Sequence, residues 1–428
     1  MRKSFTEFLP RFSFKLENLG YSGLIQLSNI LAPLATYPYL IKTLGLEDLG
    51  RVVFAQTIAG YLVLLIDLGF NISATRLVTE KRSHPRELSK VFSAVILVKG
   101  ALFFLAMILA VSIYPYIAAL QGHGALYFAS LWSCAYAAFF AQWFFQGMED
   151  FKWVAIPNIT LKIISVFFIF LIVDDDSDAL FVPVIFAIGA AVGLIQSLYV
   201  LRRRYHITFC VPDKRELAKV FFDALPMFAI SSIGGLHVKS AKYFAGTFVG
   251  MPAVAVIDIA EKLHSVASIP LNVMSQVLFP NVVRSKNWKN VYRWLPIILI
   301  INIFTILVFI KFGPWFLGLI GNGDLADSNK TVILYLWLLP LSTFNCFLGI
   351  LTLCALGRDS DFMKSSILGA ALYFISIYGL YLAEKHLYFD FLIISTLMAE
   401  MFIALSNLFF ICKFLIGKSA CREVKVND

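Results

Sequence analysis

About twelve long apolar runs dominate this sequence, and they constrain its fold more than any other feature. A helix needs about 20 apolar residues to cross the hydrocarbon core of a bilayer. The strands of a membrane barrel would alternate between apolar and polar residues, whereas these runs are uninterrupted. The sequence therefore predicts an all-α integral membrane protein with about 12 transmembrane helices. The predicted spans are 18–43, 52–73, 91–117, 124–146, 153–173, 180–201, 218–245, 253–280, 294–313, 331–356, 364–383 and 389–412.

The composition agrees with a chain that lies almost entirely inside the membrane. Hydrophobic residues make up 59% of the 428 residues and charged residues only 15%, with a mean hydropathy of +0.80. A soluble domain carries about 25% charged residues. No predicted external loop exceeds roughly 20 residues, which leaves no room for an extramembrane catalytic domain. Six cysteines are too few for a disulfide framework.

The placement of the basic residues predicts which side of the membrane each loop faces. Of the 36 Lys and Arg residues, 26 fall at the termini or in the even-numbered turns, five on the opposite face and five inside spans. Because basic residues collect in cytoplasmic loops, both termini are expected in the cytoplasm, with the acidic stretch 174–178 outside. The basic charges are spread over many short loops, which excludes a nucleic-acid-binding face. The basic start lacks a signal-peptide core, so the first span is expected to be retained.

The two halves of the chain are expected to repeat one another. The longest cytoplasmic turn, 202–217, divides the spans six and six and predicts two pseudo-symmetric six-helix bundles, residues 1–205 and 206–428. Gly45 aligns with Gly250, and both halves begin with a cytoplasmic basic stretch, so the repeats are parallel. Under this alignment Lys239 and Lys242 correspond to positions inside the first span. They are therefore expected in the outer half of the membrane.

Charged and titratable side chains inside the spans are the candidate functional residues. A charge at the bilayer centre costs about 2.5–3.5 kcal/mol on insertion scales, so such a residue is expected to face a protein interior or a watery cavity. Five of the candidates are lysines, and a cavity wall with that bias would attract an anion. The candidates are Asp67, Lys99, Lys162, Asp223, His237, Lys239, Lys242, Asp258, Glu261, Lys262 and Glu400.

Each cation has an alternative explanation. Lys99 lies only a few residues into its span and could extend to the cytoplasmic interface. Lys162 lies too deep for that and is the better cavity candidate. Lys239 and Lys242 share one helix face, so they predict either a concentrated positive patch in a cavity or a pair that reaches the outer surface.

The acidic candidates also have simpler explanations. Asp258 and Lys262 are four residues apart and are expected to pair on one helix face, whereas Glu261 needs another partner. Asp67 could instead pair with Arg76 across a helix end. Asp223 could be interfacial, and Glu400 could be a buried structural residue that only forms hydrogen bonds.

Signals for catalysis are weak. The sequence contains no HExxH, CxxC, GxSxG or P-loop motif, so it predicts neither a metal site nor an ATP-driven pump of the P-loop type. Glu47 and Asp48 follow the first span, where some membrane glycosyltransferases keep an acidic residue. Those enzymes also carry a large external domain or loop, which this chain lacks, so an acidic helix start is the preferred interpretation. No catalytic residue, cofactor or metal is expected.

Several local motifs resemble the signature of a known family. The motifs are Gly45–Gly50 (GLEDLG), Val53–Ile58 (VFAQTI), Asp67–Asn71 (DLGFN), Ala74–Arg76 (ATR), Gln146–Glu149 (QGME), Asp223–Pro226 (DALP), Gly250 and Ala260–Lys262 (AEK) before Pro280. In order and spacing they resemble the bacterial O-antigen and polysaccharide (Wzx-type) flippases of the multidrug/oligosaccharidyl-lipid/polysaccharide exporter superfamily, over essentially the whole chain. Ile257–Asp258 departs from the pattern, since relatives commonly show an aromatic residue there.

The resemblance implies a flippase of the bacterial inner membrane that is not an enzyme. Its substrate would be an oligosaccharide repeat unit linked through pyrophosphate to undecaprenol, moved outward by alternating access of the two bundles. Implied partners are membrane lipid, a coupling proton or sodium ion, a polysaccharide polymerase and a chain-length regulator. The residues expected to attract the anionic substrate are Lys99, Lys162, Lys239, Lys242, Lys262 and Arg76. Those expected to pair or couple ions are Asp67, Asp258, Glu261 and Glu400.

Two other functions remain open on the sequence. A cation-coupled multidrug exporter of the same superfamily would favour acidic residues in its pore, whereas this interior is rich in lysine. A membrane polysaccharide polymerase or glycosyltransferase is the competing class of enzyme.

Overall fold

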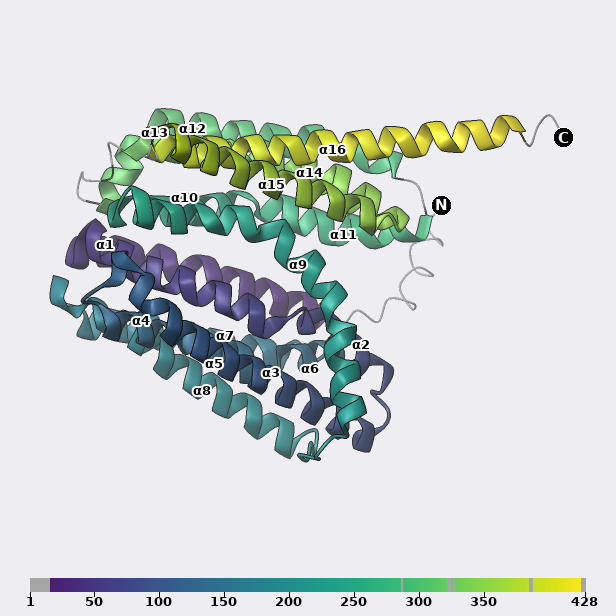
Figure 1. Ribbon diagram of the computed structural model, residues 1–428, viewed down its shortest axis with the longest axis horizontal. Coiled ribbons are helices and arrows are strands. Elements are labelled where there is room, and N and C mark those ends of the chain that lie inside the picture. The colour runs from purple at the N-terminus through teal and green to yellow at the C-terminus, as the bar shows by residue number, and fades with distance from the viewer. Residues whose placement is uncertain (1–15, 286–287, 322–324, 326–327, 385–387, 425–428) are drawn as a thin grey trace. The chain divides into compact units, whose positions relative to one another are not determined.

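The described chain is helical throughout. The computed structural model describes residues 16–285, 288–321, 325, 328–384 and 388–424, and no strand occurs among them (Figure 1). The all-α prediction is confirmed. The main helices are α1 (Leu16–Asp67), α2 (Phe70–Glu80), α3 (Pro85–Ile113), α4 (Gly124–Ser130), α5 (Trp132–Phe139), α6 (Gln142–Gly147), α7 (Lys152–Ile172), α8 (Phe181–Arg203), α9 (Lys214–Phe248), α10 (Met251–Ala267), α11 (Ile269–Ser285), α12 (Leu295–Gly321), α13 (Asn329–Leu336), α14 (Leu338–Asn345), a π-helix (Cys346–Leu353), α15 (Asp359–Glu384) and α16 (Phe389–Val424).

The protein is a multi-pass membrane protein. Within the described ranges, nine helical segments are long and apolar enough to cross a bilayer. One of them, Gly20–Glu80, covers the first two predicted spans. The predicted spans 218–245 and 253–280, which carry seven of the eleven charged and titratable candidates, are not among the nine. The predicted count of about twelve is consistent with these segments.

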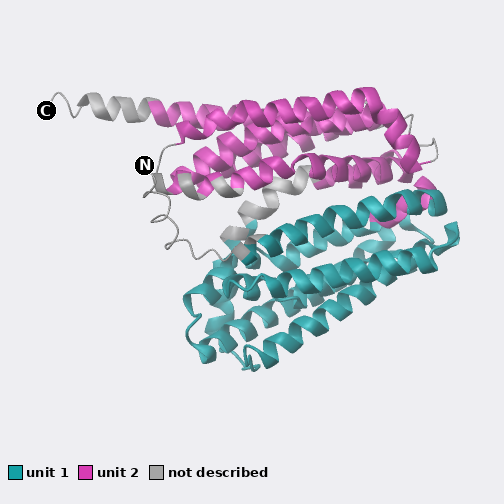
Figure 2. Cartoon of the chain, turned by 180° about the vertical axis from the view of Figure 1, so that it is seen from behind, with its two compact units in different colours: residues 1–44, 55–229 teal, residues 45–54, 230–428 magenta. Residues whose placement is uncertain are grey.

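The chain divides into two compact units. Unit 1 comprises residues 1–44 and 55–229, and unit 2 comprises residues 45–54 and 230–428 (Figure 2). In unit 1, α7 packs along α8, and in unit 2, α15 packs along α16. The division of the units falls within α9, whereas the predicted boundary at residue 205 precedes that helix.

Two glycines interrupt the helices at the positions that the predicted repeat aligns. Gly45 breaks α1 with φ 74° and ψ 175°, and Gly250 precedes α10 with φ 136° and ψ 169°. Side chains rarely adopt such positive φ values, so glycine is the residue suited to both breaks. The two aligned glycines thus share an unusual backbone conformation, which supports the alignment of the halves.

Two predicted spans are broken into short helices. The run 124–146 folds as α4, α5 and α6, and the run 331–356 folds as α13, α14, the π-helix and a final 3₁₀ turn. Their apolar composition favours burial in the membrane, but it does not fix the hydrogen-bonding pattern of the backbone.

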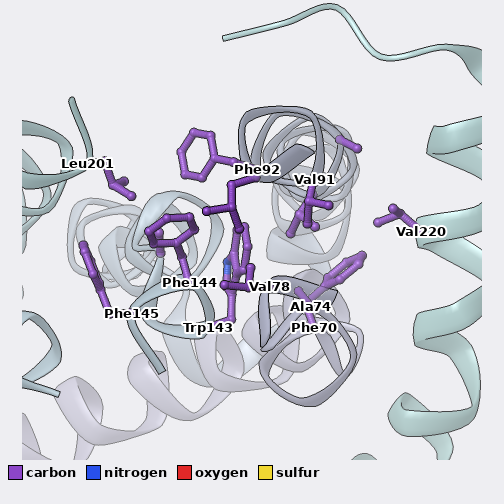
Figure 3. Packing of buried hydrophobic residues seen from close by; sticks show 14 of the residues in the cluster. Phe70, Ala74, Val78, Val91, Phe92, Trp143, Phe144, Phe145, Leu201 and Val220 are labelled. Atoms are coloured by element: carbon purple, nitrogen blue, oxygen red, sulfur yellow. The ribbon is translucent and has the colours of Figure 1, made fainter. Parts of the chain in front are cut away.

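A cluster of large aromatic side chains forms the core at one end of unit 1. Trp143, Phe144 and Phe145 of α6 are each 0% exposed. Figure 3 shows them beside Phe92 of α3 and Val78 of α2. This packing holds α2, α3 and α6 together around the two motifs described below.

The long helices also carry exposed apolar stripes. On α12, Ile300, Ile303, Phe304 and Leu307 are exposed at helical spacing. An apolar stripe of this kind would be costly in water and is typical of a surface in contact with lipid.

Candidate functional site

Three charged candidates of unit 2 form one cluster. Lys242 Nζ of α9 lies 2.5 Å from Asp258 Oδ1 of α10 and also forms an ion pair with Glu261 Oε2. Lys242 and Asp258 lie equally far before and after Gly250, so the helix break there lets the two side chains meet. Glu261 follows on the same face of α10, three residues after Asp258. We call these three residues the Lys242 cluster.

The Lys242 cluster carries more negative than positive charge. Asp258 is 3% exposed, and the side chain of Lys242 is 12% exposed. With both carboxylates ionised, these three residues by themselves carry a net charge of −1, and the ammonium of Lys239 is close enough to act on Glu261 as well. A charge that is largely withdrawn from water favours an additional cation or proton, because an unbalanced buried charge is costly.

The predicted pairing of Asp258 with Lys262 is wrong, whereas the prediction that Glu261 has a different partner is confirmed. Among the described residues, Asp258 forms its ion pair with Lys242 of the preceding helix and not with Lys262 of its own. Glu261 does find another partner, again Lys242. Spacing within one helix could not indicate this pairing. Lys262 is half-buried on α10.

Lys239 lies one turn before the cluster and is exposed. It is close enough to Glu261 and Lys242 to be influenced by both charges. The expected positive patch of Lys239 and Lys242 is therefore reduced, since carboxylates neutralise Lys242. His237 falls among the α9 side chains that lie outside the description, and Asp223 is exposed near the start of that helix.

Lys99 forms a second buried ion pair, in unit 1. It is 1% exposed, and its Nζ lies 3.1 Å from Asp67 Oδ1. Asn71 Nδ2 donates to the other carboxylate oxygen at 2.8 Å. Two expectations are corrected here. Lys99 is buried in an ion pair and does not reach the interface, and the ion-pair partner of Asp67 is Lys99 rather than Arg76.

Arg76 is exposed, whereas the residues beside it join two helices. Its Nε donates to Glu80 at 2.8 Å, and its side chain is 80% exposed. The neighbouring Thr75 and Thr79 donate to the carbonyl oxygens of Trp143 and Gly147. These contacts join the motif at Ala74–Arg76 to the motif at Gln146–Glu149.

The motif at Gln146–Glu149 makes three further contacts, through Gly147 and Glu149. Arg82 donates to the Gly147 oxygen at 3.0 Å and pairs with the Glu149 carboxylate at 2.9 Å. Asn18 donates to the Glu149 backbone oxygen at 2.9 Å. Both motifs therefore connect helices of unit 1.

Gly147→Ala is expected to destabilise the protein by about 1–3 kcal/mol, because overpacking a close contact costs that much. An added Cβ would lie 2.7 Å from Val78 Cβ and 2.9 Å from Thr75 O. Gly100→Ala on α3 is the matched control, since nothing lies within 4 Å of its added Cβ. The midpoint of thermal unfolding in detergent should fall for Gly147→Ala and not for Gly100→Ala. Equal midpoints would contradict the packing role.

Lys162 lines a hollow on unit 1. The hollow has a volume of about 750 Å³ and lies between α1 and α7. Its lining is apolar apart from Ser28 and Lys162, with Leu31, Phe167 and Phe170 among the apolar side chains. Lys162 Nζ also lies 5.8 Å from the ring centre of Phe186. An apolar surface with one ammonium group is suited to a ligand that is part lipid and part anion.

Glu400 borders a second hollow, in unit 2, with a different lining. This hollow of about 420 Å³ is lined by polar and apolar residues of α10, α11, α14, the π-helix, α15 and α16, and nine of the fourteen are Ser, Asn, His or Glu. Asn345 Nδ2 donates to Glu400 Oε2 at 2.5 Å. The sequence reasoning missed Asn345 and the lining set Ser265, Ser268, Asn272 and Ser275. Their spacing of three, four and three residues is a helical polar stripe that could have revealed them.

The described part of the chain holds no group of three or more His, Cys, Asp or Glu side chains suited to a metal. The five described cysteines are all free thiols.

A family comparison agrees with the pattern of motifs. The sequence profile of the family described as "Polysaccharide biosynthesis protein" matches residues 16–286. Two curated relatives share the description "Putative O-antigen transporter". The one from Escherichia coli K12 is 24% identical over 62% of this chain and 64% of its own length. The one from Shigella dysenteriae is 26% identical over 64% of this chain and 68% of its own length. The chain thus matches less than two thirds of the E. coli protein.

Solved structures share the fold across almost the whole chain. An inward-facing multidrug resistance MATE family transporter of the MOP superfamily superposes with a TM-score of 0.64 at 15% identity, covering 94% of this chain and 98% of its own. A MOP superfamily transporter from Pyrococcus furiosus, whose report describes a binding pocket of reversed polarity, superposes with a TM-score of 0.58 at 15% identity, covering 94% of both chains. At this identity the likeness shows the fold alone.

Proposed function

Because this chain belongs to the polysaccharide biosynthesis protein family, we propose that it is a flippase for lipid-linked oligosaccharides. The substrate is an oligosaccharide repeat unit carried on undecaprenyl pyrophosphate. The protein moves it outward across the bacterial inner membrane by alternating access, with both termini in the cytoplasm. A polysaccharide polymerase and a chain-length regulator then use the exported unit. The names of the two curated relatives support a transporter of this kind.

The hollow beside Lys162 is the observation that carries the proposal. A lipid pyrophosphate joins a long apolar chain to a strongly anionic group. The hollow offers apolar walls and one ammonium group on the same surface. A lysine binds phosphate through charge-assisted hydrogen bonds, which are stronger than neutral ones. Lys239 and Lys262 supply further positive charge in unit 2, whereas Lys99 and Lys242 are already paired with carboxylates.

The Lys242 cluster is the proposed coupling site. Its net negative charge favours one proton or one sodium ion. Binding of that ion would neutralise the cluster, and its release would restore the charge. An ion gradient could in this way bias the transport cycle.

Lys162→Ala tests the proposal in cells. The loss of one charge-assisted contact, worth about 1.5–3 kcal/mol, predicts a roughly 10- to 100-fold drop in transport. In a strain whose own copy of the gene is deleted, surface polysaccharide should fall and lipid-linked units should accumulate inside. Lys152→Ala is the control, because this exposed lysine opens the same helix. Normal surface polysaccharide with Lys162→Ala would refute the assignment of Lys162.

One observation favours a second candidate function. The net negative Lys242 cluster would also suit a cationic drug, as in a cation-coupled multidrug exporter. Deletion of the gene separates the possibilities. Loss of a flippase leaves no repeat units outside the cell, and loss of a polymerase leaves single units there. Loss of an exporter leaves the polysaccharide unchanged but raises sensitivity to cationic dyes.

A further inference from the structure

We infer that the polar hollow of unit 2 is a binding site for a neutral sugar residue. This inference rests in part on the proposed function, because a flippase of lipid-linked oligosaccharides must also accommodate the sugar. The hollow has a polar lining, one carboxylate held in a fixed orientation, and a volume suited to a small molecule.

The lining is unusually polar for the interior of a membrane protein. Nine of the fourteen lining residues are Ser, Asn, His or Glu. Polar groups inside a membrane protein are costly unless they are satisfied or serve a function. Their concentration around one hollow therefore points to a hydrated ligand rather than to packing.

The hydroxyl groups around the hollow are arranged as acceptors. Ser275 donates its hydroxyl hydrogen to Asn272 O, Ser342 to Leu339 O, and Ser366 to Phe362 O. Each of these serines uses its single donor within its own helix, so its oxygen lone pairs can accept from a ligand. A sugar residue presents several hydroxyl donors at once, which matches this arrangement.

The carboxylate of Glu400 is held in position from one side. Asn345 Nδ2 donates both to Glu400 Oε2 at 2.5 Å and to the Glu400 backbone oxygen at 3.0 Å. Asn407 Nδ2 in turn lies 3.4 Å from Asn345 Oδ1. Asn345 is the last residue of α14, and the π-helix begins directly after it. Such π-helical turns are rare and frequently occur at functional sites.

The size and charge of the hollow select the class of ligand. At about 420 Å³ it lies within the usual range for small-molecule sites, and it far exceeds the roughly 30 Å³ of one water molecule. A dehydrated metal ion would leave most of this space empty. The carboxylate of Glu400 disfavours an anion, so the pyrophosphate is not the occupant. A neutral polyhydroxylated group fits the volume and the acceptors.

The test measures sugar binding to the purified full-length protein in detergent. Glucose, galactose, mannose and N-acetylglucosamine are each added at millimolar concentration, and saturation-transfer NMR reports binding. At least one sugar should give a signal with the unaltered protein. Asn272→Leu and Glu400→Gln should each weaken it about tenfold or more. Asn290→Leu, which alters an exposed residue outside the hollow, should leave it unchanged.

Two outcomes would overturn the inference. One is the absence of any sugar signal, or an equal signal from all variants, in samples with unchanged thermal stability. The other is that sodium chloride stabilises the protein more than choline chloride does, that Glu400→Gln abolishes this difference, and that no sugar gives a binding signal. That result would make the hollow a cation site. Neither outcome tests the flippase proposal, which is tested separately by export in cells that carry Lys162→Ala.

Discussion

Lys99→Met is expected to destabilise unit 1 by about 3 kcal/mol, at the lower end of the range for breaking a buried ion pair. Lys99 is 1% exposed, so its ammonium has almost no contact with solvent. Its removal leaves the Asp67 carboxylate without the cation 3.1 Å away. Asp67 keeps its hydrogen bond from Asn71, which limits the loss. The midpoint of thermal unfolding in detergent should fall, with less folded protein recovered from membranes.

A double variant distinguishes lost charge balance from lost packing. Lys99→Met combined with Asp67→Asn removes both charges and should recover most of the stability, because replacing a whole buried pair is often neutral. Lys90→Met is the matched control on the same helix, since its exposed ion pair with Glu87 is worth at most about 1 kcal/mol. If Lys99→Met and Lys90→Met unfold at the same temperature, the buried ion pair contributes nothing to the stability of the protein.

The sequence was informative wherever a feature depends on residues close together in the chain. The length of the apolar runs indicated membrane-crossing helices, and the two glycines aligned by the repeat, Gly45 and Gly250, indeed share positive φ values. The charged candidates inside the spans were also visible, because each is conspicuous in an apolar run.

The partners of those charges could not be predicted, because they come from different helices. Asp67 and Lys99 are separated by 32 positions, and Lys242 and Asp258 by 16. Helical spacing relates side chains three or four residues apart on one helix and is silent about contacts between helices. Two of the five lysines expected to attract an anion are therefore neutralised in ways that only the tertiary structure reveals.

Broken helices were missed for a related reason. The run 124–146 is apolar enough to suggest one continuous span, yet it folds as three short helices. A break inside a membrane protein frees backbone carbonyl groups, which must find other donors. Thr75, Thr79 and Arg82 of unit 1 provide such donors to carbonyls of α6. This compensation comes from residues distant in sequence, so hydropathy alone could not show it.

Two substitutions in the Lys242 cluster are expected to have opposite effects, because one makes its net charge more negative and the other makes it neutral. Lys242→Ala should remove the cation that pairs with both Asp258 and Glu261, leaving two adjacent carboxylates. We expect a loss of about 3–5 kcal/mol and little folded protein. Glu261→Gln should instead leave a neutral Lys242–Asp258 pair, so the protein should fold normally.

Glu261→Gln is therefore the variant that separates coupling from folding. If the net negative charge of the cluster binds the coupling ion, this variant should reach the membrane at normal levels but lose at least tenfold in export. Low pH or sodium should stabilise the purified unaltered protein, and this stabilisation should be absent in Glu261→Gln. Glu47→Gln is the matched control, since Glu47 is also paired with a basic residue, Arg51, but is exposed. Full export with Glu261→Gln would remove the cluster from the coupling mechanism, because no charge would remain there for an ion to balance.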